Sequence, residues 1–300
     1  MRTLYSSLLT FALVVLVSGC QRASTPAGTD AGTQGTPAGA ASARGAQGTV
    51  TVKGSDTMVI LGQRWAENFM KQYADAKLQV TGGGSGTGIA SLINGTTDIA
   101  MSSRPIKDAE KQQVKQRNPN GPVELVVARD GITFYVHESN PVEALTIEQL
   151  KGIYLGDITR WKDVGGKDAP IVVLSRENSS GTYVFVKDTV LGGEDFTERA
   201  QTLPGTAAVV NAVSLERNGI GYGGSAYARG IKELKVKKDA GSEPVAASEE
   251  NIKSGTYPLS RDLFFYLPRE ATGTTRAFID YALSPEGQKL VAEVGYFPVK

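Results

Sequence analysis

Three short segments of the sequence place hydroxyl side chains beside glycine, and each comes just before a predicted helix. They are GSDT at 54–57, GSGT at 84–87 and SGT at 180–182. A helix N-terminus has free backbone N–H groups and a partial positive charge, so it attracts anions, and glycine lets the main chain come close to a ligand. One such segment alone is more often a simple helix cap. Their repetition favours an oxyanion site built from several helix starts.

The glycine-rich stretch at 81–92, TGGGSGTGIASL, does not have the sequence of a nucleotide-binding loop. Gly83 and Gly88 have the spacing of a Walker A motif, but Ile89 and Ala90 occupy the positions where that motif requires lysine and a magnesium-binding hydroxyl. The dinucleotide pattern G-x-G-x-x-G also fails in every register of this stretch. A small oxyanion therefore fits the loop better than a nucleotide does.

Two charged residues sharpen this hypothesis. Arg176 follows a predicted buried strand, and its guanidinium fork matches an oxyanion, with an ion pair to Glu177 or another acid as the alternative. Asp98 is expected at a strand end, where its carboxylate would accept a proton carried by the ligand. Hydrogen phosphate has such a proton at neutral pH and sulfate does not, so a buried acceptor would reject sulfate. A turn or cap formed by Asp98 is the alternative.

The elements around these segments alternate between strand and helix. Residues 49–53 predict a strand, and the helix after them has apolar residues every four positions over 61–73. This alternation indicates a parallel α/β sheet, in which ligands bind outside the carboxyl ends of the strands. We therefore expect Ser55, Ser85 and Asp98 to lie at that edge of the sheet.

Eight motifs follow one another in a specific order, although each is weak alone. They are GSDT at 54–57, GGGSGTGI at 82–89, DIAMSSRP at 98–105, DGITFYV at 130–136, LTIEQLKGIYLGDITRWKDVGG at 145–166, SRENSSGTY at 175–183, GIGYGG at 219–224 and YPLSRDLFFY at 257–266. In this order the chain, from about residue 49 to its C-terminus, resembles the phosphate-binding subunits of phosphate ABC importers, which are type II periplasmic binding proteins.

The resemblance implies an α/β fold of two lobes that are joined by two crossover strands, with phosphate bound in the cleft between them. The crossovers would match 130–136 and 261–266. Lobe 1 would then comprise 49–133 and 265–300, and lobe 2 would comprise 134–264. The resemblance also implies a monomer without cofactor or metal, which delivers inorganic phosphate to the permease subunits of an ABC transporter.

Carried over motif by motif, the resemblance also implies which residues bind phosphate. They are Thr57, the Met58 backbone, Ser85, Asp98, Arg176, Ser180, Gly181 and Thr182, with Ser55 and Arg104 as secondary candidates. Two positions depart from the pattern of some members. Asn178 stands where an acidic residue pairs with the binding arginine, which would leave Arg176 less neutralised. Arg104 also replaces an acid, which would make the mouth of the cleft more positive.

The N-terminal sequence predicts export and lipid attachment. Residues 1–20 have a basic start, an apolar run shorter than the ~20 residues of a membrane span, and small residues before Cys20, the only cysteine. This pattern is typical of a lipoprotein signal in which Cys20 is acylated, with an ordinary signal peptide as the alternative. Residues 21–48 are mostly small and polar and predict a flexible tether. We expect an exported protein, in the periplasm or at the cell surface, anchored to a membrane.

The charge of the chain is nearly balanced, with 32 Lys and Arg against 31 Asp and Glu, so there is no global basic field for nucleic acid. Three alternatives stay open: a binding protein for another tetrahedral oxyanion such as sulfate or molybdate, a hydrolase or phosphatase that uses Ser85 or Ser180, and a phosphate sensor or adhesin on the same fold. The enzyme is disfavoured because the only histidine, His137, falls in or near a predicted crossover, and no metal-ligand motif is present.

Overall fold

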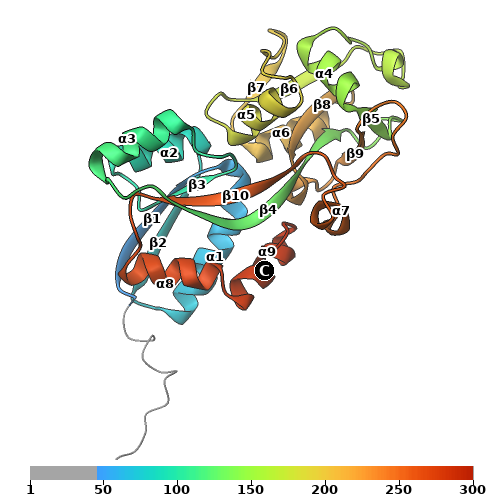
Figure 1. The fold of residues 1–300 in the computed structure, drawn as a ribbon. Coiled ribbons are helices and arrows are strands. Elements are labelled where there is room, and N and C mark those ends of the chain that lie inside the picture. Colours follow the sequence, from blue (N-terminus) through green and yellow to red (C-terminus); the bar gives the residue numbers. More distant parts are fainter. Residues whose placement is uncertain (1–45, 300) are drawn as a thin grey trace, which may run out of the picture. The chain divides into compact units, whose positions relative to one another are not determined.

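The computed structural model describes residues 46–299, which form a mixed α/β structure on a ten-stranded sheet (Figure 1). The strands are β1 (Gly48–Gly54), β2 (Ala76–Thr81), β3 (Ile99–Ser102), β4 (Val123–Val136), β5 (Ala144–Thr146), β6 (Val172–Arg176), β7 (Gln201–Leu203), β8 (Gly219–Gly224), β9 (Lys232–Lys237) and β10 (Ser260–Leu267). The α-helices are α1 (Val59–Gln72), α2 (Ser85–Asn94), α3 (Asp108–Arg117), α4 (Ile147–Leu155), α5 (Gly181–Thr189), α6 (Thr206–Leu215), α7 (Glu249–Lys253), α8 (Gly273–Ala282) and α9 (Pro285–Val294). The 3-10 helices are η1 (Asp56–Met58), η2 (Trp161–Val164) and η3 (Ser225–Tyr227).

The strand order divides the sheet into two parallel groups. Its main path runs β2-β1-β3-β10-β4-β8-β6-β7, and β9 joins β5 to β4. In the first group β1 is parallel to β2 and β3, and in the second β6 is parallel to β7 and β8. Parallel neighbours need a crossover connection, usually a helix, which is why strands and helices alternate in the sequence. The predicted α/β class is confirmed.

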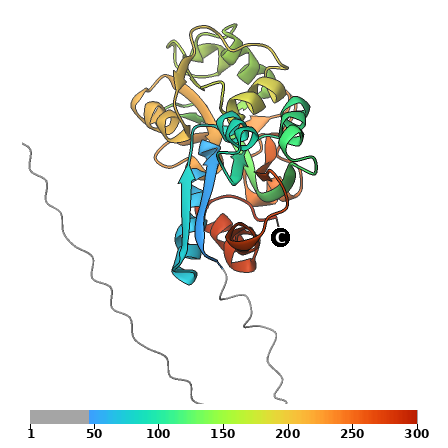
Figure 2. The same cartoon turned by 90° about the vertical axis from the view of Figure 1, so that its left-hand side faces the viewer.

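Strands β4 and β10 lie between the two groups and connect them. They are antiparallel to each other, and β10 also pairs with β3. Residues 123–131 of β4 pair with β10, whereas residues 132–136 pair with β8 and β9 of the second group. Figure 1 shows these strands side by side between two groups of elements, as a two-lobed fold with two crossovers requires, and Figure 2 shows the two groups one above the other.

Each group of strands has its own hydrophobic core. The first core packs α1, α8 and α9 against the sheet, with Trp65, Phe69 and Phe278 among its buried side chains. The face of the first group that carries α2 and α3 has a smaller core around Ile89 and Tyr266. The apolar face predicted for 61–73 is thus the face that α1 buries against the sheet.

The second core gathers residues between 132 and 259, together with Phe297 from the C-terminal segment. The chain passes from the first core to the second between Ala128 and Ile132, and it returns to the first core between Leu259 and Leu263. The lobe boundaries predicted at 133/134 and 264/265 fall close to these points and stay a prediction.

Within residues 46–299, no helix has both the length and the apolar character needed to cross a bilayer. The predicted signal at 1–20, with Cys20, and most of the tether at 21–48 lie outside the described residues.

Candidate functional site

The carboxyl ends of the first group of strands bring three serines together. Ser55 follows β1, Ser103 follows β3, and Ser85 begins α2 after β2. The Ser55 hydroxyl donates to Ser103 Oγ over 2.9 Å, and Ser85 Oγ lies 3.3 Å from Ser103 Oγ. Ser103 also donates its backbone N–H to Ser85 Oγ at 3.0 Å. All three side chains are buried, so a network of hydroxyls lies where parallel strands end.

The start of α5, in the second lobe, meets this network. Thr182 Oγ1 lies 3.0 Å from Thr57 Oγ1 of η1, and both side chains are buried. Ser180 caps α5, and its hydroxyl accepts from the backbone N–H groups of Thr182 and Tyr183 at 3.2 Å. We call Ser55, Thr57, Ser85, Ser103 and Thr182 the hydroxyl cluster. It joins residues from both lobes, at the N-terminal ends of η1, α2 and α5 and, for Ser103, at the carboxyl end of β3.

Two glycines allow the lobes to approach each other this closely. A Cβ atom added to Gly181 would lie 2.3 Å from Ser85 Oγ and 2.7 Å from Ser103 Oγ. A Cβ on Gly84, whose φ is +91°, would lie 2.6 Å from the Ser179 carbonyl oxygen. Gly86 completes the contact by donating its N–H to the same Ser179 carbonyl at 2.8 Å. Any side chain at 84 or 181 would separate the lobes at the cluster.

Arg176, at the end of β6, is buried and uses four of its five N–H groups in hydrogen bonds to protein groups. Its Nη2 donates to Asp56 Oδ2 at 2.9 Å and to Glu177 Oε1 at 2.8 Å, Nε donates to Glu177 Oε2 at 3.0 Å, and Nη1 donates to Thr206 Oγ1 at 2.9 Å. The bond to Asp56 reaches across to the other lobe. Partial burial favours a raised pKa for Glu177, but hydrogen bonding and the charge of Arg176 outweigh it and hold this pKa below its ordinary value.

The structure corrects the prediction for Asp98. This residue comes immediately before β3, so it lies at the amino end of the strand and not at the carboxyl end, where the cluster forms. Its carboxylate is exposed and accepts hydrogen bonds from the Thr51 backbone N–H and hydroxyl, both at 2.8 Å. The carboxylate thus ties the start of β3 to the neighbouring strand β1, which is neither the proton acceptor nor the local turn or cap expected from the sequence. Ser103 follows the carboxyl end of β3 and therefore lies at the edge of the sheet where Asp98 was expected.

The two predicted departures in charge are also corrected. Arg104 does not enlarge a positive cleft mouth, because its Nη1 and Nη2 donate to both Glu110 oxygens at 2.9 and 2.7 Å. Burial tends to raise the pKa of Glu110, but the hydrogen bond and charge of Arg104 lower it overall. Asn178 does not leave Arg176 less neutralised, since Glu177 and Asp56 both pair with that guanidinium.

The other predicted site residues lie beside the cluster without joining it. The Met58 backbone N–H donates to the Ser55 carbonyl within η1. Ser180 and Gly181 lie at the first turn of α5. His137, which was not predicted to be a site residue, follows β4, and its Nδ1 accepts the Ser139 backbone N–H at 3.1 Å, which ties the imidazole to its own loop.

Sequence reasoning missed three residues of the site. Ser103 is in the DIAMSSRP motif, and its place after a short apolar strand was the available signal. Asp56 is in GSDT, and a charged residue between two hydroxyls was also visible. Arg261, on β10, contacts Thr57 and Thr182 at 3.3 and 3.0 Å, and nothing local in the sequence indicated this.

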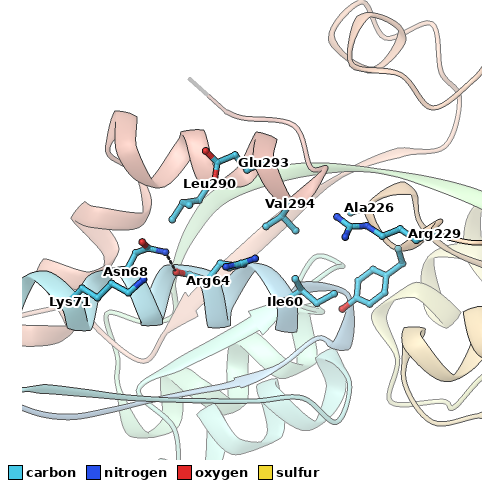
Figure 3. A pocket seen from close by; sticks show the side chains of 10 residues that line it. Ile60, Arg64, Asn68, Lys71, Ala226, Arg229, Leu290, Glu293 and Val294 are labelled. Carbon is cyan, nitrogen blue, oxygen red and sulfur yellow. Dashed lines mark hydrogen bonds between the residues drawn. The ribbon is translucent and has the colours of Figure 1, made fainter.

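A separate pocket of about 350 Å³ opens on the surface between α1, α9 and η3 (Figure 3). Arg64, Lys71 and Arg229 contribute cationic side chains to it and Glu293 an anionic one, over an apolar floor that includes Val294. These residues are distinct from the hydroxyl cluster.

The comparisons with known proteins agree with this geometry. Residues 39–286 match the model of the PBP superfamily domain. The phosphate-binding protein PstS of Pseudomonas aeruginosa is 34% identical over 274 residues, which cover 86% of this chain and 85% of the relative. PstS of Staphylococcus aureus is 35% identical over 255 residues, covering 81% of this chain and 76% of the relative.

The solved structures include a protein described as a phosphate ABC transporter substrate-binding protein, from Clostridium perfringens, with bound phosphate. It is 35% identical, its TM-score is 0.77, and the match covers 84% of this chain and 100% of that one. The chain belongs to the PBP superfamily and, within it, to the family of PstS phosphate-binding proteins.

Proposed function

We propose that this protein binds inorganic phosphate between its two lobes and delivers it to an ABC permease for import. The observation that supports this most directly is the hydroxyl cluster, because it places buried hydrogen-bond donors from both lobes at the starts of three helical segments. A tetrahedral oxyanion needs many convergent donors and gains from the positive ends of helices. Binding would close the lobes around the ligand.

We propose that Asp56, and not Asp98, is the acceptor that selects hydrogen phosphate over sulfate. Asp56 adjoins Thr57, and its oxygens accept the Gly83 N–H and the Arg176 guanidinium, each at 2.9 Å. A carboxylate oxygen has more than one lone pair, so Asp56 retains the capacity to accept a proton from hydrogen phosphate. Sulfate has no proton to donate, and would place two sets of lone pairs against each other.

Two other functions are less well supported. A sulfate- or molybdate-binding protein would use the same donors but would gain nothing from Asp56. A serine hydrolase needs a general base beside its nucleophile. The single histidine of the sequence is bound to Ser139, the hydroxyl of Ser85 contacts that of Ser103, and the hydroxyl of Ser180 accepts from backbone N–H groups of α5. We therefore infer a binding protein without catalytic activity, as expected for a family of solute-binding proteins.

The location and partners follow from the same proposal. A binding protein for import acts outside the cytoplasmic membrane and docks on permease subunits there. The lipobox ending at Cys20 supports a lipid-anchored form, with residues 21–48 as its tether. We propose that the folded part acts as a monomer.

Calorimetric titration of the purified folded part with phosphate and with sulfate tests the proposal. We expect one phosphate per chain, no measurable sulfate binding, and a phosphate preference that falls at least about tenfold in Asp56→Asn, because the amide no longer accepts from the ligand as a carboxylate does. Asp108→Asn changes the charge equally on the exposed start of α3 and serves as the control. Absence of phosphate binding, or equal binding of sulfate, would overturn the assignment. Steady release of phosphate from a monoester would favour the enzyme.

A further inference from the structure

A second arginine lies directly beneath the hydroxyl cluster. Arg261, on β10, pairs with Asp130 on β4, so the pair joins the two crossover strands. Both side chains are almost completely buried, with 5% and 0% of their surface exposed. Burial of an ion pair costs desolvation that only good hydrogen bonding offsets. The hydrogen-bond partners of the guanidinium therefore decide how well its burial is compensated.

The guanidinium divides its donors among both lobes. Nη2 donates to Thr57 Oγ1 of the first lobe at 3.3 Å and to Thr182 Oγ1 of the second at 3.0 Å. Nη1 donates to the Ser103 carbonyl at 2.9 Å. Arg261 is thus in contact with three of the segments that form the cluster, although it lies outside every one of the predicted binding positions.

The pairing with Asp130 leaves the guanidinium free to make these contacts. Nε and Nη2 both donate to the single oxygen Oδ2, at 3.2 and 2.9 Å. Oδ1 has no hydrogen-bond partner among the described residues. A purely structural pair would favour the two-oxygen arrangement, which is the stronger one. Here the fork is turned partly away from the carboxylate and toward the two threonines.

These contacts determine which way the threonine hydroxyls point. Nη2 has two hydrogens, one for Asp130 Oδ2 and one that the oxygen atoms of Thr57 and Thr182 share, and because arginine has donors only, both threonine oxygens act as acceptors in these contacts. Each hydroxyl hydrogen must then point away from Arg261. In the structure the two oxygens are 3.0 Å apart, so one hydroxyl donates to the other. An oxyanion bound at the cluster would instead receive both hydrogens.

We propose that Arg261 is a positioning residue for anion binding: it orients the hydroxyls of Thr57 and Thr182 as donors and does so only when the lobes are closed. Its charge, partly balanced by Asp130, adds attraction from beneath the site. This inference rests on the proposed function, since it assigns a residue to the same anion site. It also explains why an arginine on a crossover strand reaches residues of both lobes.

A double-mutant cycle tests this role. Arg261→Lys keeps the charge but loses the fork, and Thr182→Val removes the hydroxyl on which it acts. We expect each single change to weaken phosphate binding about ten- to a hundredfold, as for loss of a hydrogen bond to a charged group. The double variant should be only a few-fold weaker than the worse single variant, because both remove the same interaction. Arg129→Lys is the matched control, since Arg129 pairs with Asp262 between the same two strands at the exposed surface.

Asp130→Asn provides a second measurement with the opposite sign. Removing the balancing carboxylate leaves the charge of Arg261 unopposed, so phosphate should bind several-fold more tightly while the ligand-free protein melts at a lower temperature. If the pair were only structural, the melting temperature would fall and the dissociation constant would not change.

The outcomes separate the two proposals. A wild type that binds no phosphate overturns the proposed function. A wild type that binds phosphate, with additive effects in the cycle and an unchanged dissociation constant in Asp130→Asn, overturns the role of Arg261 alone. If Arg261→Lys does not fold, the Asp130→Asn result decides: tighter binding supports the role, and unchanged or weaker binding refutes it.

Discussion

Replacing Gly181 by alanine should weaken phosphate binding without disturbing either hydrophobic core. Gly181 begins α5, and its missing Cβ is where Ser85 and Ser103 of the other lobe come closest, at 2.3 and 2.7 Å. Real Cβ atoms essentially never come within 3.0 Å of another heavy atom, so at least one group must shift. The neighbours are held by the hydrogen bonds of the cluster. The added methyl group therefore destabilises the closed arrangement of the two lobes and does not affect an open one.

The size of the effect follows from the cost of overpacking. An extra methyl group in a well-packed site costs about 1–3 kcal/mol. If phosphate binds tightly only when the lobes close, all of this cost appears in the dissociation constant. At about 1.4 kcal/mol for each tenfold change, we expect binding to weaken by about 5- to 150-fold. The melting temperature of the ligand-free protein should change little, because the contact lies between the lobes.

Gly86→Ala is the graded control for this experiment. A Cβ atom added to Gly86 would lie 3.3 Å from the Ser179 carbonyl oxygen, at the same contact between the lobes. This distance is tight, but a small shift relieves it. Calorimetry should rank wild type, Gly86→Ala and Gly181→Ala in order of decreasing affinity, and small-angle scattering should show less compaction by phosphate in Gly181→Ala. Wild-type affinity in Gly181→Ala would refute the idea that this contact belongs to the bound state.

Three further expectations concern charge and anchoring. Glu177 has a pKa below its ordinary value of 4.5 in the folded protein, so its stabilising contribution is present above pH 4.5 and is lost as the pH falls through the lowered pKa; Glu177→Gln should flatten the acid side of a plot of melting temperature against pH. Phosphate affinity should fall only weakly between low and moderate salt, because the arginines of the site are buried and paired, and a steep loss would contradict this pairing. In cells fed labelled palmitate, the wild type should incorporate label and Cys20→Ser should not; equal labelling would refute the lipobox.

The architecture could be predicted because its signals are local. Helix α1 buries Trp65 and Phe69, which lie on the apolar face that a spacing of four predicts. The alternation of strands and helices indicated a parallel sheet, whereas the two crossover strands were implied by the resemblance that the ordered motifs support. In these cases a few neighbouring residues contain the information that the fold uses.

The site was harder to predict because it depends on strand ends and on distant contacts. Asp98 and Ser103 belong to one motif, and choosing between them required knowing that β3 begins at Ile99. The chemistry of a carboxylate favoured Asp98, whereas the direction of the strand places Ser103 at the ligand edge. Arg261 is 131 residues from Asp130 and 204 from Thr57 in sequence, so only tertiary structure brings it to the cluster.

The charges of the site bear on how it would hold an anion. Arg176 pairs with Asp56 and Glu177, and Arg261 pairs with Asp130, so two guanidinium groups face three carboxylates and the sum is one negative charge. Burial raises the pKa of Asp130 while Arg261 opposes the rise, and even a protonated Asp130 would bring the sum only to zero.

Net charge therefore cannot be what attracts a dianion to this cleft. What remains is local: hydroxyl groups whose hydrogens can all turn toward the ligand, and the positive ends of the helices that begin at Ser85 and Gly181. Such dipoles act over short distances and need a dry, closed site to be effective. The arginines then serve mainly to fix geometry. Arg176 links its lobe to Asp56 of the other lobe, and Arg261 orients two threonines, one from each lobe. A substitution that prevents lobe closure should therefore also abolish phosphate binding.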